Sequence, residues 1–148
     1  MRTPEQMRGF LFWQRWLVAS GILITGFGLA MALTSGTALF DVFNRQIDPA
    51  FWGNKAPDDT AKAFQHWLYG VWGATIAGWG VFVAFVAYYP FLNREKWSRN
   101  CLVAGLVLWY LFDTALSAYH RVYFNVGFNT VLLIALMLPI IRTRKAFG

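Results

Sequence analysis

The chain contains very little cysteine and histidine and few charged residues. Its 148 residues include one cysteine and two histidines, and only 14% are charged. Because Cys101 is the single cysteine, an intramolecular disulfide, a cysteine-based zinc site and Cys-x-x-Cys redox chemistry are all excluded. We therefore expect no metal site.

Familiar catalytic motifs are also missing. The sequence has no His-Glu-x-x-His, no Gly-x-Ser-x-Gly and no glycine-rich phosphate loop. It has no basic cluster with interleaved aromatic residues outside its apolar runs, so we expect no nucleic-acid partner. Asp113 and His66 would supply an acid and a base, but without a nucleophile or a metal they favour a non-enzymatic role and leave an enzyme open.

Apolar residues are abundant, at 57% of the chain, and they fall into four long runs. The runs are Leu17–Phe40 and Val122–Ile141, which contain no charge, Ala63–Asn93, which contains only His66, and Asn100–Tyr119, which contains Asp113. Each reaches the roughly 20 residues that cross about 30 Å of hydrocarbon. The sequence predicts one all-α membrane domain over residues 1–148, with four transmembrane helices in an antiparallel left-handed bundle and spans near 14–36, 64–89, 99–119 and 122–142.

The basic residues are distributed unevenly between the two ends of these spans. One side carries Arg2, Arg8, Arg15, Arg94, Lys96, Arg99, Arg142, Arg144 and Lys145. The other side carries Arg45, Lys55, Lys62 and Arg121, which are offset by four aspartates in the connection between the first two spans. By the positive-inside rule we expect both termini in the cytoplasm and the protein in the inner membrane of a bacterium.

Two helix starts can be read directly from the sequence. Thr3 as N-cap, Pro4 at the first helical position and Gln6 three residues after the cap form a capping box. Residues 57–60 give a start signal for the second long helix, with carboxylates in its first turn. Between these elements, the loop from about residue 36 to 60 contains Phe43 and other apolar side chains, so we expect it to fold onto the outer face as a cap.

Small residues recur with a period of 3.5 in the first two spans. The two stripes include Gly21, Thr25 and Gly28 in the first span and Gly73, Ala77 and Gly80 in the second. Small residues let membrane helices approach closely, and this period favours a left-handed crossing. We expect spans one and two to pack through these faces, unless one stripe instead mediates dimerisation.

Polar residues gather toward the outer ends of the spans. This group contains Asp113, Ser117, Arg121, Asn125 and Asn129, together with His66 and His120. A carboxylate inside an apolar span is energetically costly, so we expect it to be paired with another polar group or to have a function. The favoured interpretation is a structural Asp113–Arg121 ion pair supported by the two asparagines.

Three alternatives remain open for the same residues. Asp113, Arg121, Asn125, Asn129, His66 and Ser117 would form a ligand site for an outer-leaflet amphiphile such as a lipid or a quinone. His66 and His120 would ligate a b-type haem, although no cofactor is assigned. Proton-coupled transport is the third alternative.

These features favour a small non-catalytic accessory subunit of a larger membrane assembly. Its partners would be the lipid bilayer and either other proteins or further copies of the chain. An amphiphile-binding protein or carrier and a cofactor-bearing membrane redox protein are the alternative functions.

Overall fold

The computed structural model describes residues 3–38, 40–53 and 55–147, and the regular structure within them is helical. The elements are α1 (Pro4–Thr34), α2 (Asp41–Trp52), α3 (Asp59–Tyr88), α4 (Lys96–Tyr119), α5 (Tyr123–Thr143) and the short 3-10 helix η1 (Arg144–Phe147). Four of them, α1, α3, α4 and α5 continued by η1, are long and apolar enough to cross a membrane. The prediction of an all-helical chain with four long apolar helices is confirmed.

The first two long helices begin at the capping signals read from the sequence. Thr3 Oγ1 accepts a hydrogen bond from the Gln6 amide at 3.3 Å, and Gln6 Oε1 accepts one from the Thr3 amide at 3.2 Å. Asp58 is the N-cap of α3, and its Oδ1 accepts a hydrogen bond from the Ala61 amide at 2.8 Å. Both starts are confirmed because each depends only on contacts within one helical turn.

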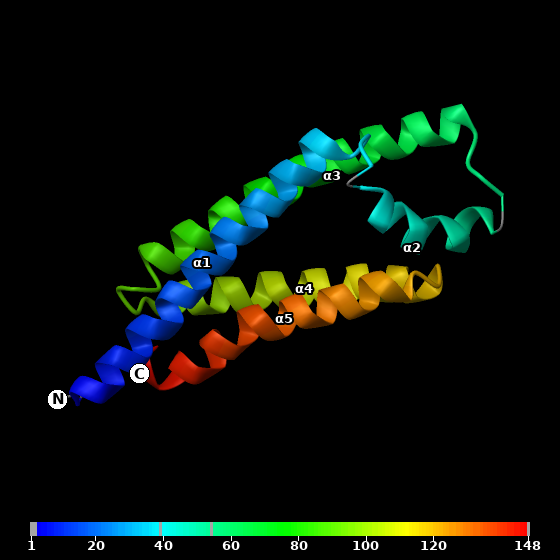
Figure 1. Cartoon of the computed structure of the whole chain (residues 1–148). Coiled ribbons are helices and arrows are strands. Elements are labelled where there is room, and N and C mark those ends of the chain that lie inside the picture. Colours follow the sequence, from blue (N-terminus) through cyan, green and yellow to red (C-terminus); the bar gives the residue numbers. More distant parts are fainter. Residues whose placement is uncertain (1–2, 39, 54, 148) are drawn as a thin grey trace.

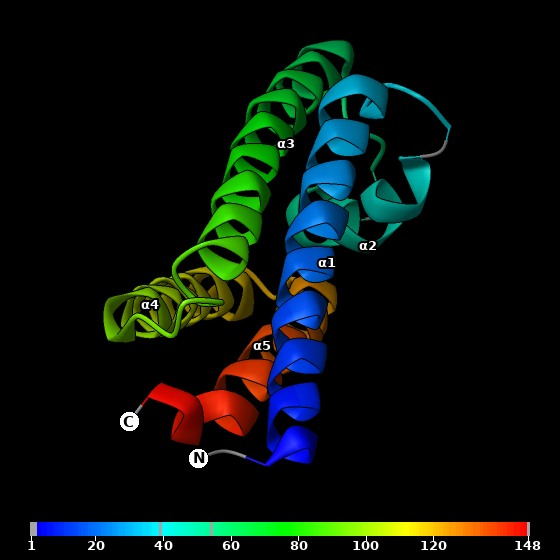
Figure 2. The same cartoon turned by 90° about the vertical axis from the view of Figure 1, so that its left-hand side faces the viewer.

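Helices α1 and α3 form the most extensive pair in the fold and run antiparallel (Figures 1 and 2). At one end the Gln14 side chain donates a hydrogen bond to the Ala87 carbonyl at 3.0 Å. At the other end the Ser35 hydroxyl donates to the His66 carbonyl at 3.4 Å. The pair is therefore in contact from the terminal end of the molecule to the opposite end.

Helices α4 and α5 form a second antiparallel hairpin, joined by a turn at residues 120–122. Where this hairpin meets the first, the Trp16 indole donates a hydrogen bond to the Ala135 carbonyl at 2.9 Å. Leu17, Leu106 and Leu136 are buried in the same core cluster. The two hairpins approach each other at the end that carries both termini and diverge toward the other end (Figure 1).

The segment between α1 and α3 differs from the cap loop expected from the sequence, because much of it is the helix α2. This helix lies between the two hairpins where they diverge (Figures 1 and 2). The ring of Phe43 is 6.0 Å from that of Phe27 on α1 and 5.9 Å from that of Phe124 on α5. These aromatic side chains of α2 therefore contact both hairpins where the hairpins diverge.

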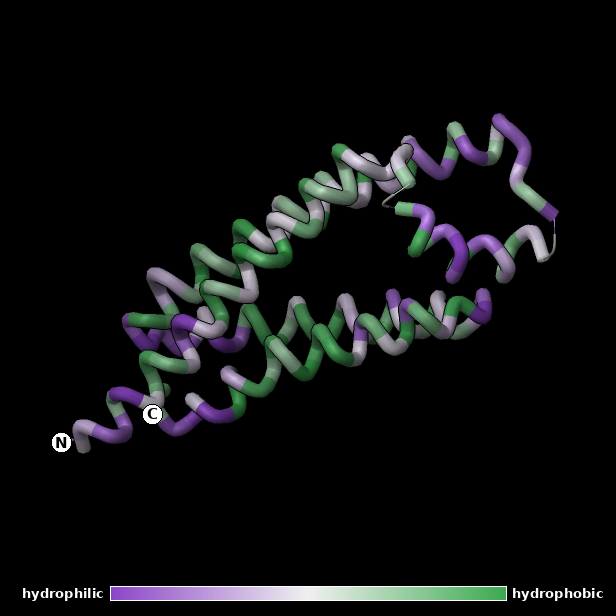
Figure 3. The backbone as a smooth tube through the Cα atoms, viewed as in Figure 1, coloured by the Kyte–Doolittle hydropathy of each residue, from purple (hydrophilic) through white to green (hydrophobic). Residues whose placement is uncertain are grey.

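Hydropathy changes from the ends to the middle of the two hairpins (Figure 3). Hydrophobic residues dominate the middle of the four long helices, and hydrophilic residues gather at both ends and along α2 (Figure 3). Large apolar side chains such as Leu23, Phe82 and Leu108 point outward from the middle stretches. A sequence whose apolar side chains face outward at mid-length fits a lipid surrounding.

Candidate functional site

Asp113 of α4 lies at the centre of a network of side-chain hydrogen bonds with α5. Its Oδ1 accepts bonds from Asn125 Nδ2 at 2.7 Å, from Asn129 Nδ2 at 2.8 Å and from the Ser117 hydroxyl at 3.2 Å. Asn129 is only 2% exposed, and Asp113, Ser117 and Asn125 are partly buried. Two helices thus supply three donors to one carboxylate oxygen.

Helical periodicity explains how these residues meet. Asp113 and Ser117 are separated by one turn on α4, and Asn125 and Asn129 are separated by one turn on α5, so each pair shares a face. The antiparallel hairpin then brings the two faces together. One turn deeper, the Tyr110 and Thr130 hydroxyls lie 3.2 Å apart across the same interface. Polar contacts therefore hold the half of the α4–α5 hairpin next to its turn.

Arg121 does not join this network, which corrects the expected Asp113–Arg121 ion pair. Helix α4 ends at Tyr119, and Arg121 lies in the turn with a left-handed φ of 62° and an exposed side chain. Eight residues of helix correspond to about 12 Å, so the Cα of Arg121 lies well beyond the level of the Asp113 carboxylate along the helix axis. Between described residues, the ion pair that forms is Lys62–Asp59 on the surface. The amides of α5 take the place expected for the guanidinium.

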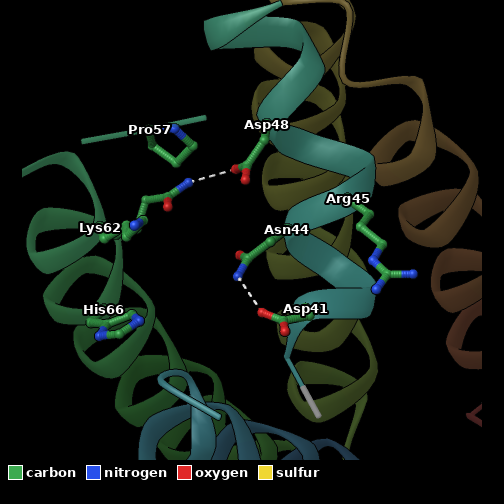
Figure 4. A pocket seen from close by; sticks show the side chains of 8 residues that line it. Asp41, Asn44, Arg45, Asp48, Pro57, Lys62 and His66 are labelled. Carbon is green, nitrogen blue, oxygen red and sulfur yellow. Dashed lines mark hydrogen bonds between the residues drawn. The ribbon is translucent and has the colours of Figure 1, made fainter. Parts of the chain in front are cut away.

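His66 also lies apart from Asp113, in a polar pocket between α2 and α3. The pocket has a volume of about 250 Å³ and is lined by Asp41, Asn44, Arg45, Asp48, Pro57, Lys62, Gln65 and His66. Figure 4 shows Asp41, Asn44 and Asp48 of α2 facing Lys62 and His66 of α3, while Arg45 points to the other side of α2. This outer pocket has carboxylates on one wall and basic side chains on the other.

Few hydrogen bonds fix the walls of the outer pocket. Gln65 Nε2 donates to Asp48 Oδ1 at 2.8 Å, which links α3 to α2 across the pocket (Figure 4). Within α2, Asn44 Nδ2 donates weakly to Asp41 Oδ1 at 3.5 Å, while the buried Asn44 Oδ1 has no partner among the described residues. The pocket keeps acceptors on its α2 wall and a cation, Lys62, at its α3 rim.

The two histidines occupy different surroundings. His66 lines the outer pocket, and a Cβ placed on Gly36 would lie 3.1 Å from its ring. The ring of His120 packs against Phe51 of α2 at 5.6 Å and Tyr119 at 5.0 Å. His66 therefore faces the pocket between α2 and α3, whereas His120 contacts the aromatic side chains of Phe51 and Tyr119, and haem ligation by the pair stays a prediction. No group of three or more potential metal-ligating side chains occurs within residues 3–38, 40–53 and 55–147.

The small-residue stripes of α1 and α3 face each other in the structure. A Cβ on Gly28 would lie 2.4 Å from the backbone nitrogen of Ala77, and one on Gly80 would lie 2.5 Å from the backbone nitrogen of Thr25. Equally short distances surround Gly21 and Gly73. The Thr25 hydroxyl donates to the Gly21 carbonyl at 2.9 Å and approaches the Ala77 carbonyl at 3.4 Å. At these four glycines the facing backbone leaves no room for a Cβ.

Sequence reasoning missed the α2 wall of the outer pocket. Asp41, Asn44 and Asp48 are spaced so that they share one helical face, and Phe43, Ile47 and Phe51 share another. This double periodicity is the sequence signal that indicates a helix in place of the expected loop. Comparison of the chain with protein-family models, with curated proteins and with solved structures gives no match. The interpretation of the site therefore rests on its own geometry.

Proposed function

We propose that this chain is a non-catalytic membrane protein that acts as an accessory subunit of a larger membrane assembly. The observation that carries the proposal is the bonding of Asp113, whose Oδ1 is occupied by Asn125, Asn129 and Ser117 of the same chain. Side chains that hydrogen-bond across two membrane helices hold those helices together. Two of the three donors to Asp113 come from α5, so the carboxylate joins α4 to α5.

The uncovered surface of α4 supports a role in assembly. Along the whole helix only Ser98, Leu102 and Leu106 are buried, all in its first half. Beyond them the helix presents the exposed apolar side chains Val107, Leu108, Leu111, Phe112 and Leu116. We propose that a partner helix, from another protein or from a second copy, packs on this face, since α4 contacts the first hairpin only sparsely.

The distribution of charged residues between the two ends of the molecule supports a location and an orientation in the membrane. Both chain ends and the α3–α4 connection lie at one end of the molecule (Figure 1). That end carries the arginine-rich segments, and the opposite end combines basic residues with four aspartates. We propose a bacterial inner-membrane location with the terminal end in the cytoplasm and the outer pocket outside.

Site-specific photo-crosslinking tests the proposed assembly. A benzoylphenylalanine at Phe112 on α4 should give a protein adduct of defined mass in intact membranes, because a partner helix would cover that position. The matched control is Phe82 on α3, which is similarly exposed at 71% compared with 65% and should give mainly lipid adducts. A monomeric chain with no protein adduct from Phe112 would refute the accessory role.

The outer pocket supports a second candidate function, the binding of an amphiphile headgroup from the outer leaflet. Its opposed walls, with Asp41 and Asp48 on α2 and Lys62 and His66 on α3, suit a zwitterion that carries an ammonium and a phosphate.

Thermal shift in detergent tests this candidate. A short-chain phosphatidylcholine should raise the Tm of the wild-type protein, and Asp48→Asn or Lys62→Gln should remove the shift. Lys55→Gln is the control, because Lys55 lies outside the residues that line the pocket. An equal shift in all four proteins would indicate a general detergent effect and would reject the pocket.

A further inference from the structure

The end of the molecule that carries both termini has far more basic than acidic side chains. Its described basic residues are Arg8, Arg15, Arg94, Lys96, Arg99, Arg142, Arg144 and Lys145, and its acidic residues are Glu5 and Glu95. The Glu95 carboxylate already accepts a hydrogen bond from the Trp97 indole. The chain therefore supplies too few carboxylates to neutralise this end.

Arg94 is held in place by its backbone and by aromatic packing. It follows α3 with a left-handed φ of 62°, and its amide donates to the Phe91 carbonyl at 2.9 Å. Its guanidinium lies 4.9 Å from the ring centroid of Phe10, and Nη2 lies 3.1 Å from the Met7 sulfur. Phe10 itself stacks on Phe91 and contacts Phe147 of η1. The guanidinium is thus held against α1, whose Phe10 is in turn packed between Phe91 and Phe147.

Arg94 Nε is buried and has no hydrogen-bond acceptor among the described residues, and the same is true of Arg99 Nε. Arg99 lies in the first two turns of α4, on the heptad stripe that continues through Val103 and Leu106 to Tyr110. Because the Tyr110 hydroxyl contacts Thr130 of α5, this stripe faces α5 at the level of Tyr110. Two partly buried guanidinium groups, five residues apart in sequence, each present an N–H that lacks an acceptor.

A buried N–H of a cation without an acceptor is costly, and guanidinium groups pair best with phosphate or carboxylate. We propose that Arg94 and Arg99 bind the phosphate of an acidic phospholipid from the leaflet at the terminal end. A lipid fits better than a soluble phosphate because the two arginines lie where the apolar helices end. The exposed Trp97 lies between them in the sequence, and tryptophan is typical of a membrane interface. Basic sites between helices on the cytoplasmic side commonly hold acidic headgroups.

Native mass spectrometry of the purified protein in detergent micelles tests this site. We titrate phosphatidylglycerol and phosphatidylcholine of the same chain length and count the lipids bound. The wild-type protein should bind the first phosphatidylglycerol at least tenfold more tightly than phosphatidylcholine. Arg94→Gln and Arg99→Gln should each weaken phosphatidylglycerol binding about fivefold, the effect of one basic residue near an acidic headgroup.

Arg121→Gln is a matched control, because Arg121 has the same left-handed φ of 62° as Arg94 but lies at the other end of the molecule. It should leave phosphatidylglycerol binding unchanged. If Arg94→Gln does not fold, the phosphatidylglycerol affinity of Arg99→Gln tests the site by itself. Arg99 lies in a regular helix, so glutamine should be tolerated there.

Three results would overturn the proposal. The first is equal binding of the two lipids by the wild-type protein, and the second is an equal loss in the Arg121→Gln control. The third is displacement of phosphatidylglycerol by inorganic phosphate at the same concentration, which would assign the site to a soluble phosphate instead of a lipid.

Discussion

Replacing Gly28 with alanine should separate α1 from α3 and destabilise the folded protein. The new Cβ would lie 2.4 Å from the Ala77 nitrogen, 2.5 Å from the Gly73 carbonyl oxygen and 2.9 Å from the Ala77 Cα. Carbon atoms in normal contact are about 3.5–4.0 Å apart, so the two backbones must move apart by roughly 1 Å. Because the obstructing atoms are backbone atoms of a rigid helix, no side-chain rotation relieves the clash.

The size of the effect can be worked from two opposing terms. Overpacking a well-packed interface costs about 1–3 kcal/mol, and a clash with backbone on both sides belongs near the upper end. Alanine returns about 0.5–1 kcal/mol through its greater helix propensity. We therefore expect Gly28→Ala to lower the free energy of unfolding by about 2 kcal/mol.

Gly26, two residues earlier in the same helix, is the matched control. A Cβ there would meet nothing within 4 Å. Gly26→Ala should leave the free energy of unfolding unchanged or raise it by up to about 1 kcal/mol. Equilibrium unfolding in mixed micelles with a rising fraction of denaturing detergent, followed by tryptophan fluorescence, measures both variants. Equal stability of Gly28→Ala and Gly26→Ala would refute the close approach of α1 and α3.

Three further predictions follow from other parts of the fold. Asp113→Asn should lower stability by about 1–2 kcal/mol because charge-assisted hydrogen bonds become neutral ones, and adding Arg121→Gln should restore nothing since the two side chains do not pair. In a cysteine-free Cys101→Ser background, an impermeant thiol reagent applied to intact cells should label Lys55→Cys and leave Lys145→Cys unlabelled. Phe43→Ala should lower stability by about 2 kcal/mol and expose the α2–α3 connection to protease, because its ring packs between the hairpins.

Each of these predictions has a result that contradicts it. Recovery of stability in the Asp113→Asn, Arg121→Gln double variant would restore the ion pair expected from the sequence. Labelling at residue 145 without labelling at residue 55 would invert the topology. For α2 the control is Val42→Ala, since Val42 is 63% exposed, and equal losses at positions 42 and 43 would show that the helix does not depend on its aromatic face.

The α4–α5 network could be predicted from the sequence only in part. The spacing of Asp113 with Ser117 and of Asn125 with Asn129 places each pair on one helical face, so the residues of the cluster were predictable from periodicity alone. Which donor reaches the carboxylate was not predictable. The turn geometry at Arg121, with its left-handed φ, directs the guanidinium away and leaves the two amides in register.

Helix α2 could be predicted only in part from the sequence. Its polar and aromatic residues have helical spacing, but a short helix of mixed composition carries no long apolar run and does not show what its two faces contact. Its aromatic face packs on Phe27 of the preceding helix α1 and on Phe124 of α5, which lies far away in the chain. The same placement brings Asp48 to Gln65 and makes His66 part of the outer pocket.

The sequence by itself determined the four long helices and the starts of the first two. These depend on apolar runs, caps and charges whose partners lie within one helical turn or in the surrounding solvent or lipid. Only the tertiary structure decided how the two hairpins diverge, that α2 fills the space between them, and which amides satisfy Asp113. Those outcomes depend on contacts between residues far apart in the chain, and such contacts leave no local pattern from which they could be read.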